Sequence, residues 1–158
     1  MKNILWLLVV VSSFSLAQDS VQDYPMGPIA KLTPGELCDR PTRYRYPENI
    51  AYCERNVVLE QKEQVFLAYK KSGYRMGQNR SSFKIDHYFP LCAGGSNNNE
   101  NLWPQHLSIS AITDTIEQLG CEKMASGKIS QARFLMMVKR VKNDLRQANA
   151  VKMELSRL

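Results

Sequence analysis

One segment of the chain, residues 83–106, constrains the fold more than any other, because it reads as two strands joined by a polar loop. From Phe83 to Phe89 the odd-numbered residues are apolar or aromatic and the even-numbered ones are Lys84, Asp86 and Tyr88, so the two sets fall on opposite sides of an extended strand. Pro90 ends regular pairing, and residues 94–97 have the composition of a turn. Residues 101–103 are long enough for a second strand.

Asp86 and His87 stand side by side on the first predicted strand, and this pair suits phosphodiester chemistry. A carboxylate oxygen is a hard ligand for Mg²⁺ or Mn²⁺. A neutral imidazole takes a proton from water near pH 7. We expect Asn101 either to orient the imidazole or to brace the loop, and His106 is a candidate second metal ligand. Together these residues predict a metal ion that stabilises charge on a phosphate while His87 activates water.

A run of residue types in this segment matches a known motif: Asp86-His87-x-x-Pro90-Leu91-x-x-Gly94-Gly95-Ser96-Asn97, followed by Asn101-Leu102. This run resembles the HNH endonuclease family, also called the ββα-metal or His-Me finger family. A wider pattern is similar to a group of small secreted bacterial HNH-like proteins, and it consists of residues 101–106 with Thr113, Asp114 and Glu117. The resemblance implies that Asp86 is a metal ligand, that His87 is the general base and that Asn101 holds the loop. It also implies a divalent cofactor, Mg²⁺ or Mn²⁺, with Zn²⁺ or Ni²⁺ as alternatives.

The chain departs from this family pattern at one position. HNH proteins place a third His or Asn ligand nine residues after the Asn, and Ser110 stands there in this sequence. Serine is a poor ligand, so either His106 or Asp114 supplies the second ligand in place of Ser110, or the site is weaker. Asp114 also has a purely structural interpretation, because Asp114 and Glu117 have the spacing of a capping box at a helix start.

The first 17 residues have the features of a signal peptide: Lys2 precedes an apolar run, and Ser15 and Ala17 suit a signal peptidase. We therefore expect cleavage after Ala17 and export to a periplasm or the extracellular space. The apolar run is shorter than the roughly 20 residues that a membrane span needs. Residues 18–32 are predicted to be a flexible leader, and residues 33–158 a single HNH-like domain.

The four cysteines lie after the predicted cleavage site, and an even count in an exported chain indicates two disulfides. Four cysteines allow three pairings. We favour Cys38–Cys53, which closes a short loop, and Cys92–Cys121, which ties the motif loop to the following helix.

The formal net charge of +6 fits a polyanionic partner such as nucleic acid. Arg75, Arg80 and Lys84 lead into the motif and are candidate phosphate ligands, with a solvated surface as the equal alternative. Arginines and tyrosines alternate over residues 40–46, where they either contact nucleic acid or pack as an ordinary loop.

Helices are predicted on either side of the motif. A short one begins at Thr33, one runs from residue 56 or 57 to about Lys71, one runs from Asp114 to Gly127, and a long one follows Ser130. In the last helix an apolar face includes Val138 and Val141. The basic residues of this helix, which include Lys142, are interpreted as a solvated face, with contact to nucleic acid as the alternative. The predicted fold class is α+β, with a small antiparallel ββα-metal unit surrounded by helices and stapled by disulfides.

These patterns favour a secreted, metal-dependent endonuclease that hydrolyses phosphodiester bonds of DNA or RNA with little sequence specificity. The alternative is a degenerate module of the same fold that binds nucleic acid or an envelope polyanion without cutting it. The oligomeric state is left open.

Overall fold

The computed structural model describes residues 23–77 and 79–158. The predicted signal peptide and the start of the predicted leader lie outside these ranges. None of the helices within the described ranges is both long enough and apolar enough to cross a membrane.

The chain has an α+β fold with two small antiparallel sheets and four helices in its described part, which confirms the predicted class. The strands and helices follow the order β1 (Arg43–Arg45), β2 (Ile50–Tyr52), α1 (Leu59–Lys71), β3 (Phe83–His87), β4 (Leu102–His106), α2 (Leu107–Ala125), α3 (Gln131–Asn143) and α4 (Ala148–Ser156). Short 3-10 helices occupy Arg80–Ser82, Leu91–Ala93, Asn99–Asn101 and Leu145–Gln147.

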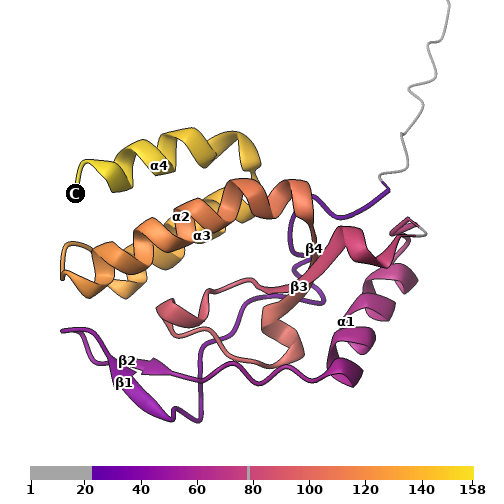
Figure 1. Ribbon diagram of the computed structural model, residues 1–158, viewed down its shortest axis with the longest axis horizontal. Helices are drawn as coiled ribbons and strands as arrows, with labels where there is room; N and C mark the ends of the chain where they lie inside the picture. Colours follow the sequence, from indigo (N-terminus) through magenta and orange to yellow (C-terminus); the bar gives the residue numbers. More distant parts are fainter. Residues whose placement is uncertain (1–22, 78) are drawn as a thin grey trace, which may run out of the picture.

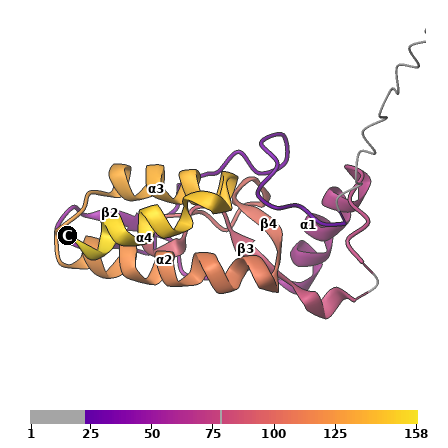
Figure 2. The ribbon, with the colours of Figure 1, turned by 90° about the horizontal axis from the view of Figure 1, so that it is seen from above.

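The β3–β4 ribbon lies between α1 on one side and the three C-terminal helices on the other (Figures 1 and 2). Its strands pair antiparallel, with Phe83 opposite His106 and His87 opposite Leu102. Helix α2 begins at the residue after β4, so β3, β4 and α2 form a continuous ββα unit.

Side-chain alternation gives the ribbon two different faces. One face carries Phe83, Ile85 and His87, and its aromatic end packs on α1, where the rings of Phe66 and Phe83 meet edge to face at 5.7 Å. The other face carries Lys84 and Asp86 and turns toward α2 and α3. The ribbon is therefore apolar toward α1 and charged toward the C-terminal helices.

The described residues bury two apolar clusters. One joins α1 to the β3–β4 ribbon and includes Tyr69 and Leu102, both almost fully buried. The other fills the space between α2, α3 and α4 and centres on Phe134. Helix α2 accommodates Phe134 through Gly120, since a Cβ at that position would overlap the phenyl ring. The polar face of the ribbon lies between the two clusters.

Both favoured disulfides are confirmed, Cys38–Cys53 and Cys92–Cys121. The first closes the loop that contains the β1–β2 hairpin, where the guanidinium of Arg45 lies 3.3 Å from the ring centre of Tyr52. Arg43 and Arg45 thus pack on a ring of their own hairpin, whereas Arg40 lies before β1.

Three helix predictions are corrected. Thr33 does not start a helix, because its hydroxyl bonds Tyr69 Oη and the Leu102 carbonyl, each at 2.8 Å, and Gly35 turns the chain at a φ of 89°. Helix α2 begins at Leu107 rather than at Asp114, because the side chain of His106 accepts the cap bond from the Ser108 amide.

The long helix expected after Ser130 does begin there, and the Ser130 hydroxyl caps it, but it ends at Asn143. Asp144 is extended, with a φ of −148°, and its side chain caps the short turn that follows. Helix α4 is therefore a separate element.

The predicted flexible leader is also corrected for residues 23–32. The ring of Tyr24 stacks on that of His106 with the centroids 4.1 Å apart. The amide of Ile29 donates to Tyr69 Oη at 3.0 Å, and the amide of Met76 donates to the Asp23 carbonyl at 2.7 Å. These residues are anchored to the domain along their length.

Candidate functional site

His87 ends strand β3 and is only 4% exposed, on the face of the ribbon that turns toward α1. Its ring lies between two side chains from distant parts of the chain. Nε2 is 3.1 Å from Asn97 Oδ1, and Nδ1 is 3.3 Å from a guanidinium nitrogen of Arg55. Asn97 belongs to the loop that follows β3, and Arg55 to the segment between β2 and α1.

The neighbours of Asn97 determine the tautomer of His87. The Asn97 amide nitrogen donates to the Glu54 carbonyl at 2.7 Å, and Oδ1 accepts from the Asn56 amide at 3.3 Å. Oδ1 is therefore the atom that faces Nε2, which must carry the hydrogen. Arg55 can only donate, so Nδ1 carries the lone pair that accepts from Arg55. The basic nitrogen of His87 points at an exposed arginine.

His87 is neutral at physiological pH. Burial lowers the pKa of its imidazole to about 4, and repulsion from the Arg55 guanidinium acts in the same direction. The hydrogen bond to Asn97 and the charge of Asp86 raise the pKa, but by less. The ring is thus available as a proton acceptor.

Asn101 braces the loop and does not contact His87. It is fully buried, and its side chain exchanges two bonds with the backbone of Phe89, accepting from the amide at 2.8 Å and donating to the carbonyl at 3.0 Å. It also donates to the Ser96 carbonyl at 2.9 Å. Of the two roles left open for Asn101, the structure supports the loop brace.

Asp86 points to the opposite face of the ribbon from His87, as alternation requires. Its Oδ2 accepts from the ammonium of Lys142 at 3.0 Å, and its Oδ1 lies 3.5 Å from the ammonium of Lys84. Although burial alone would raise the pKa of Asp86, the two lysines lower it below the ordinary value. Asp86 is a buried anion already paired with two cations.

Lys142 is the centre of this buried network, and the prediction that it is solvated is wrong. It lies on α3, is 1% exposed, and pairs with Asp86 and with Glu117 of α2, whose Oε1 is 2.7 Å away. It also donates to the His87 carbonyl. Burial by itself would lower the pKa of Lys142, but the two carboxylates raise it, so the ammonium stays charged. Burial raises the pKa of Glu117 to about 7, against the opposing effect of Lys142.

His106 lies at the other end of the ribbon, on the face opposite Asp86. The register pairs it with Phe83, whose ring it meets edge to face at 5.2 Å. Its Nδ1 accepts the cap bond from the Ser108 amide at 3.2 Å, and Tyr24 stacks on its ring. Asp86 is three steps along the strand from Phe83, which is about 10 Å, and it points to the opposite face. The metal site predicted on Asp86 and His106 is therefore not assembled.

The remaining candidate ligands do not complete a metal site either. Ser110 donates its hydroxyl to the Leu107 carbonyl at 3.0 Å. Asp114 holds the ammonium of Lys84 between its oxygens at 2.8 and 2.9 Å. Within residues 23–77 and 79–158, no three His, Cys, Asp or Glu side chains gather where they could hold a metal ion. In this arrangement the side chains do not fit a divalent ion.

The three predicted phosphate ligands are split between two places. Lys84 is partly exposed and pairs with Asp86 and Asp114. Arg75 and Arg80 line a hollow of about 930 Å³ at the His106 end, together with Tyr24 and Phe83. There the Arg80 guanidinium lies over the Phe66 ring at 4.4 Å. Arg75 and Arg80 are thus remote from His87.

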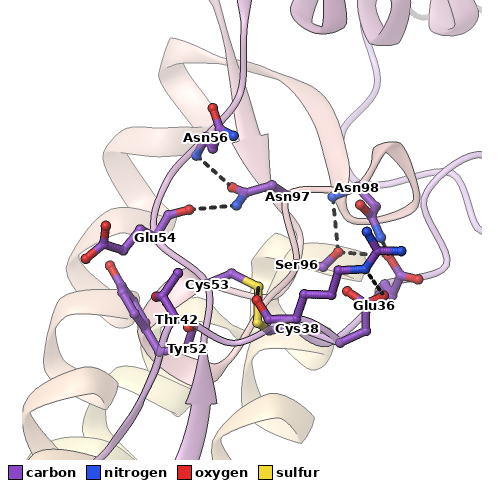
Figure 3. Close-up of a disulfide and its surroundings, with 12 residues drawn as sticks. Glu36, Cys38, Thr42, Tyr52, Cys53, Glu54, Asn56, Ser96, Asn97 and Asn98 are labelled. Carbon is purple, nitrogen blue, oxygen red and sulfur yellow. Dashed lines mark hydrogen bonds and ion pairs between the residues drawn. A yellow bond between two sulfur atoms is a disulfide. The ribbon is translucent and has the colours of Figure 1, made fainter.

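A smaller hollow of about 480 Å³ adjoins the His87 end, and Arg40, Arg55 and Asn97 are among its lining residues. Figure 3 shows its setting: Asn97 bridges to the segment that follows Cys53, beside the Cys38–Cys53 disulfide. This disulfide holds the segment carrying Arg55 close to the loop carrying Asn97.

Four residues of the site were not predicted as contacts. Arg55 and Asn97 contact His87, Lys142 contacts Asp86, and Glu117 pairs with Lys142. Asn97 and Glu117 stand inside the motif run, so their presence near the site was signalled, although not their contacts. The one signal for Lys142 was its position beside Val141, a residue on the predicted buried face. Nothing in the sequence marks Arg55.

Comparison of the chain with models of protein families, with curated proteins and with solved structures found no match.

Proposed function

We propose that this is an exported protein that hydrolyses phosphodiester bonds of DNA or RNA with little sequence specificity, and that His87 is its general base. The observation that carries the proposal is the lone pair of His87 Nδ1, which accepts from the exposed guanidinium of Arg55 at 3.3 Å. A proton acceptor next to a phosphate-binding cation is the minimum apparatus for activating water against a phosphodiester. The resemblance of the segment around Asp86 and His87 to the HNH motif supports the same reaction class.

In the proposed reaction, Arg55 holds a non-bridging phosphate oxygen, and Arg40 offers a second positive charge in the same hollow. A water beside the phosphate gives its proton to His87 Nδ1, and its oxygen bonds to phosphorus. The ester bond to the leaving oxygen breaks, and that oxygen takes a proton from solvent. The Asn97 bond keeps the Nε2 hydrogen in place throughout, which leaves Nδ1 as the base.

Arg55 also links substrate binding to basicity. Its charge is one of the causes that lower the pKa of His87 to about 4. A phosphate bound to Arg55 would offset that charge and raise the pKa of the imidazole. His87 would then be a stronger base with substrate than without it, which favours proton transfer in the complex.

Export is part of the proposal because of the two disulfides, Cys38–Cys53 and Cys92–Cys121. Such bonds persist in oxidising compartments and are rare in the cytosol. The signal-peptide features of the first 17 residues point the same way. Arg55 and Arg40 would contact the phosphate, which is the same at every base. We therefore expect little sequence specificity.

A second candidate function has one observation in its favour. His87 is 4% exposed, and Arg55 covers its basic nitrogen. If Arg55 stays in place when a phosphate binds, the protein would hold nucleic acid or another polyanion without cutting it. The hollow beside Arg55 would then be a binding site alone.

A nicking assay on supercoiled plasmid, run in parallel with a labelled single-stranded RNA, tests the proposal on the oxidised, exported protein. His87→Gln is expected to lower the cleavage rate by about 10²–10⁴-fold, the usual contribution of a positioned base. His106→Gln is the matched control, since it replaces the other histidine in the same way, and should leave the rate within a few-fold.

Arg55→Gln and Arg40→Gln form a second matched pair, because both side chains line the hollow and only Arg55 contacts His87. Arg55→Gln should lower the rate by more than Arg40→Gln does. Binding of a fluorescent oligonucleotide without any cleavage, lost in Arg55→Gln, would replace the hydrolase with the binding module. Equal rates for the wild type and His87→Gln would refute His87 as the base.

A further inference from the structure

Helix α3 places a cation, the Lys142 ammonium, at the carboxylate of β3 where the resembling family places a metal. Three acceptors surround the Lys142 ammonium: Asp86 Oδ2 at 3.0 Å, Glu117 Oε1 at 2.7 Å and the His87 carbonyl. The ammonium donates hydrogen bonds to Asp86 and to the His87 carbonyl, and it forms an ion pair with Glu117. Lys142 is thus a buried member of the site, because the residue is only 1% exposed.

A divalent ion and this ammonium compete for the same oxygens. An ion such as Mg²⁺ binds a carboxylate oxygen at about 2.0–2.1 Å, so an ion on Asp86 Oδ2 would lie within about 5 Å of the ammonium nitrogen. The second oxygen of Asp86 already faces Lys84, at 3.5 Å. An ion on either side of the carboxylate would therefore meet a positive charge.

The other carboxylates near Asp86 are engaged in the same way. Asp114 holds Lys84 through both of its oxygens, and Glu117 holds Lys142. Two lysines thus bridge three carboxylates from β3 and α2, and the two positive charges balance most of the negative charge. For the buried members Lys142, Asp86 and Glu117, such pairing is the arrangement that buried ions require.

From this geometry we infer that the Lys142 ammonium takes the place of the metal ion at Asp86, so that the protein binds no divalent cation there and acts at His87 without one. The second part of this inference rests on the proposed function, whereas the first part does not. In this role Lys142 is a positioning residue: because one ammonium bonds both Asp86 and the His87 carbonyl, it fixes the end of the strand that presents the imidazole.

Binding of Mn²⁺ to the oxidised protein tests the first part directly. Electron paramagnetic resonance of free Mn²⁺ should give the same titration for the wild type and for Asp86→Asn. The substitution keeps the shape of the side chain and removes its charge, so the comparison cancels weak binding to surface carboxylates. One Mn²⁺ per chain in the wild type, lost in Asp86→Asn, would overturn the inference whatever the protein does to nucleic acid.

Lys142→Met supplies a complementary measurement, since it removes the ammonium and leaves Asp86 and Glu117 facing each other. This variant should gain thermal stability when Mn²⁺ is added, and the wild type should not. A melting temperature raised by Mn²⁺ equally in both proteins would contradict the inference. If the variant does not fold without metal, the comparison of the wild type with Asp86→Asn still decides the question.

Cleavage in excess EDTA tests the second part. Activity that survives EDTA and disappears in His87→Gln is the expected result. Activity abolished by EDTA and restored by Mg²⁺ would refute metal independence while leaving the hydrolase in place. A protein that cuts nothing under any condition would remove the proposed function, and the Mn²⁺ titration would still stand as the test of Lys142.

Discussion

The two histidines of this protein lie at opposite ends of the β3–β4 ribbon and have opposite surroundings. His87 sits against an arginine and an asparagine, and the carbonyl of the same residue accepts from a buried lysine. His106 sits between a stacked tyrosine and an edge-on phenylalanine and caps a helix. One end of the ribbon is held by charge and polar bonds, and the other by aromatic packing.

The difference shows that the same residue type has different roles in different surroundings. At the His87 end, groups from β3, α2, α3 and the segment after β2 converge, so the site depends on the whole fold. At the His106 end, two of the three partners of the histidine are neighbours in the ribbon or in the first turn of α2. The His87 end should therefore be sensitive to distant substitutions, and the His106 end should tolerate them.

The largest effect on stability is expected from Lys142→Met. Removing this ammonium leaves the carboxylates of Asp86 and Glu117 buried without their partner, and breaking a buried pair on one side typically costs about 3–5 kcal/mol. Urea denaturation of the oxidised protein measures the loss. Lys139→Met on the same helix is the control, because Lys139 is exposed, and should change the free energy of unfolding by less than about 0.5 kcal/mol. Equal losses of unfolding free energy in the two variants would show that the ion pairs of Lys142 do not stabilise the fold.

The second prediction concerns acid. The unfolded chain protonates His87 near pH 6.5, whereas the folded chain does so only at about 4. Between these values the unfolded state holds the extra proton, so stability is fully present above about pH 6.5 and falls as the pH drops toward 4. The free energy of unfolding that is lost over this pH range is about 3 kcal/mol.

His87→Gln isolates this contribution. Glu117, whose raised pKa acts in the opposite direction between about 7 and its ordinary value, is present in both proteins and cancels in the difference. Denaturation at a series of pH values should therefore show the wild type losing about 3 kcal/mol relative to His87→Gln between pH 6.5 and 4. Parallel curves for the two proteins would show that the imidazole is not held neutral.

A smaller effect is expected from Asn101→Ala. The substitution leaves the amide and carbonyl of Phe89 and the carbonyl of Ser96 without partners in a buried loop, which should cost about 2 kcal/mol. Because the loop carries Asn97, this variant should also disturb the His87 ring in NMR spectra. Asn98→Ala is the control in the same loop, since Asn98 is exposed. An unchanged His87 signal in Asn101→Ala would show that the hydrogen bonds of Asn101 do not determine the position of the His87 ring.

The smallest effect is expected from His106→Ala. It removes a helix cap and the stack on Tyr24, and losing a cap costs about 1 kcal/mol. The signals of the His87 ring should not move. A change there as large as that caused by Asn101→Ala would mean that the two ends of the ribbon are coupled.

The sequence alone determined the features whose causes are local. Alternation from Phe83 to His87 predicts strand β3 and its two faces, the glycines and Asn101 predict the loop, and Ser130 predicts the start of α3. Cysteine spacing favoured the observed disulfides, since one closes a short loop and the other joins the motif loop to α2. Each of these inferences needed only residues near one another or a count of cysteines.

The tertiary structure decided which of the motif residues meet. The register of β3 with β4 places His106 beside Phe83 and away from Asp86, and the break at Asp144 ends α3 just after Lys142. Burial of Lys142 depends on two carboxylates elsewhere in the chain, and the contact of Arg55 with His87 depends on the Cys38–Cys53 loop. These pairings join segments that are distant in sequence, and a periodic pattern carries no information about which distant segment will pack against it.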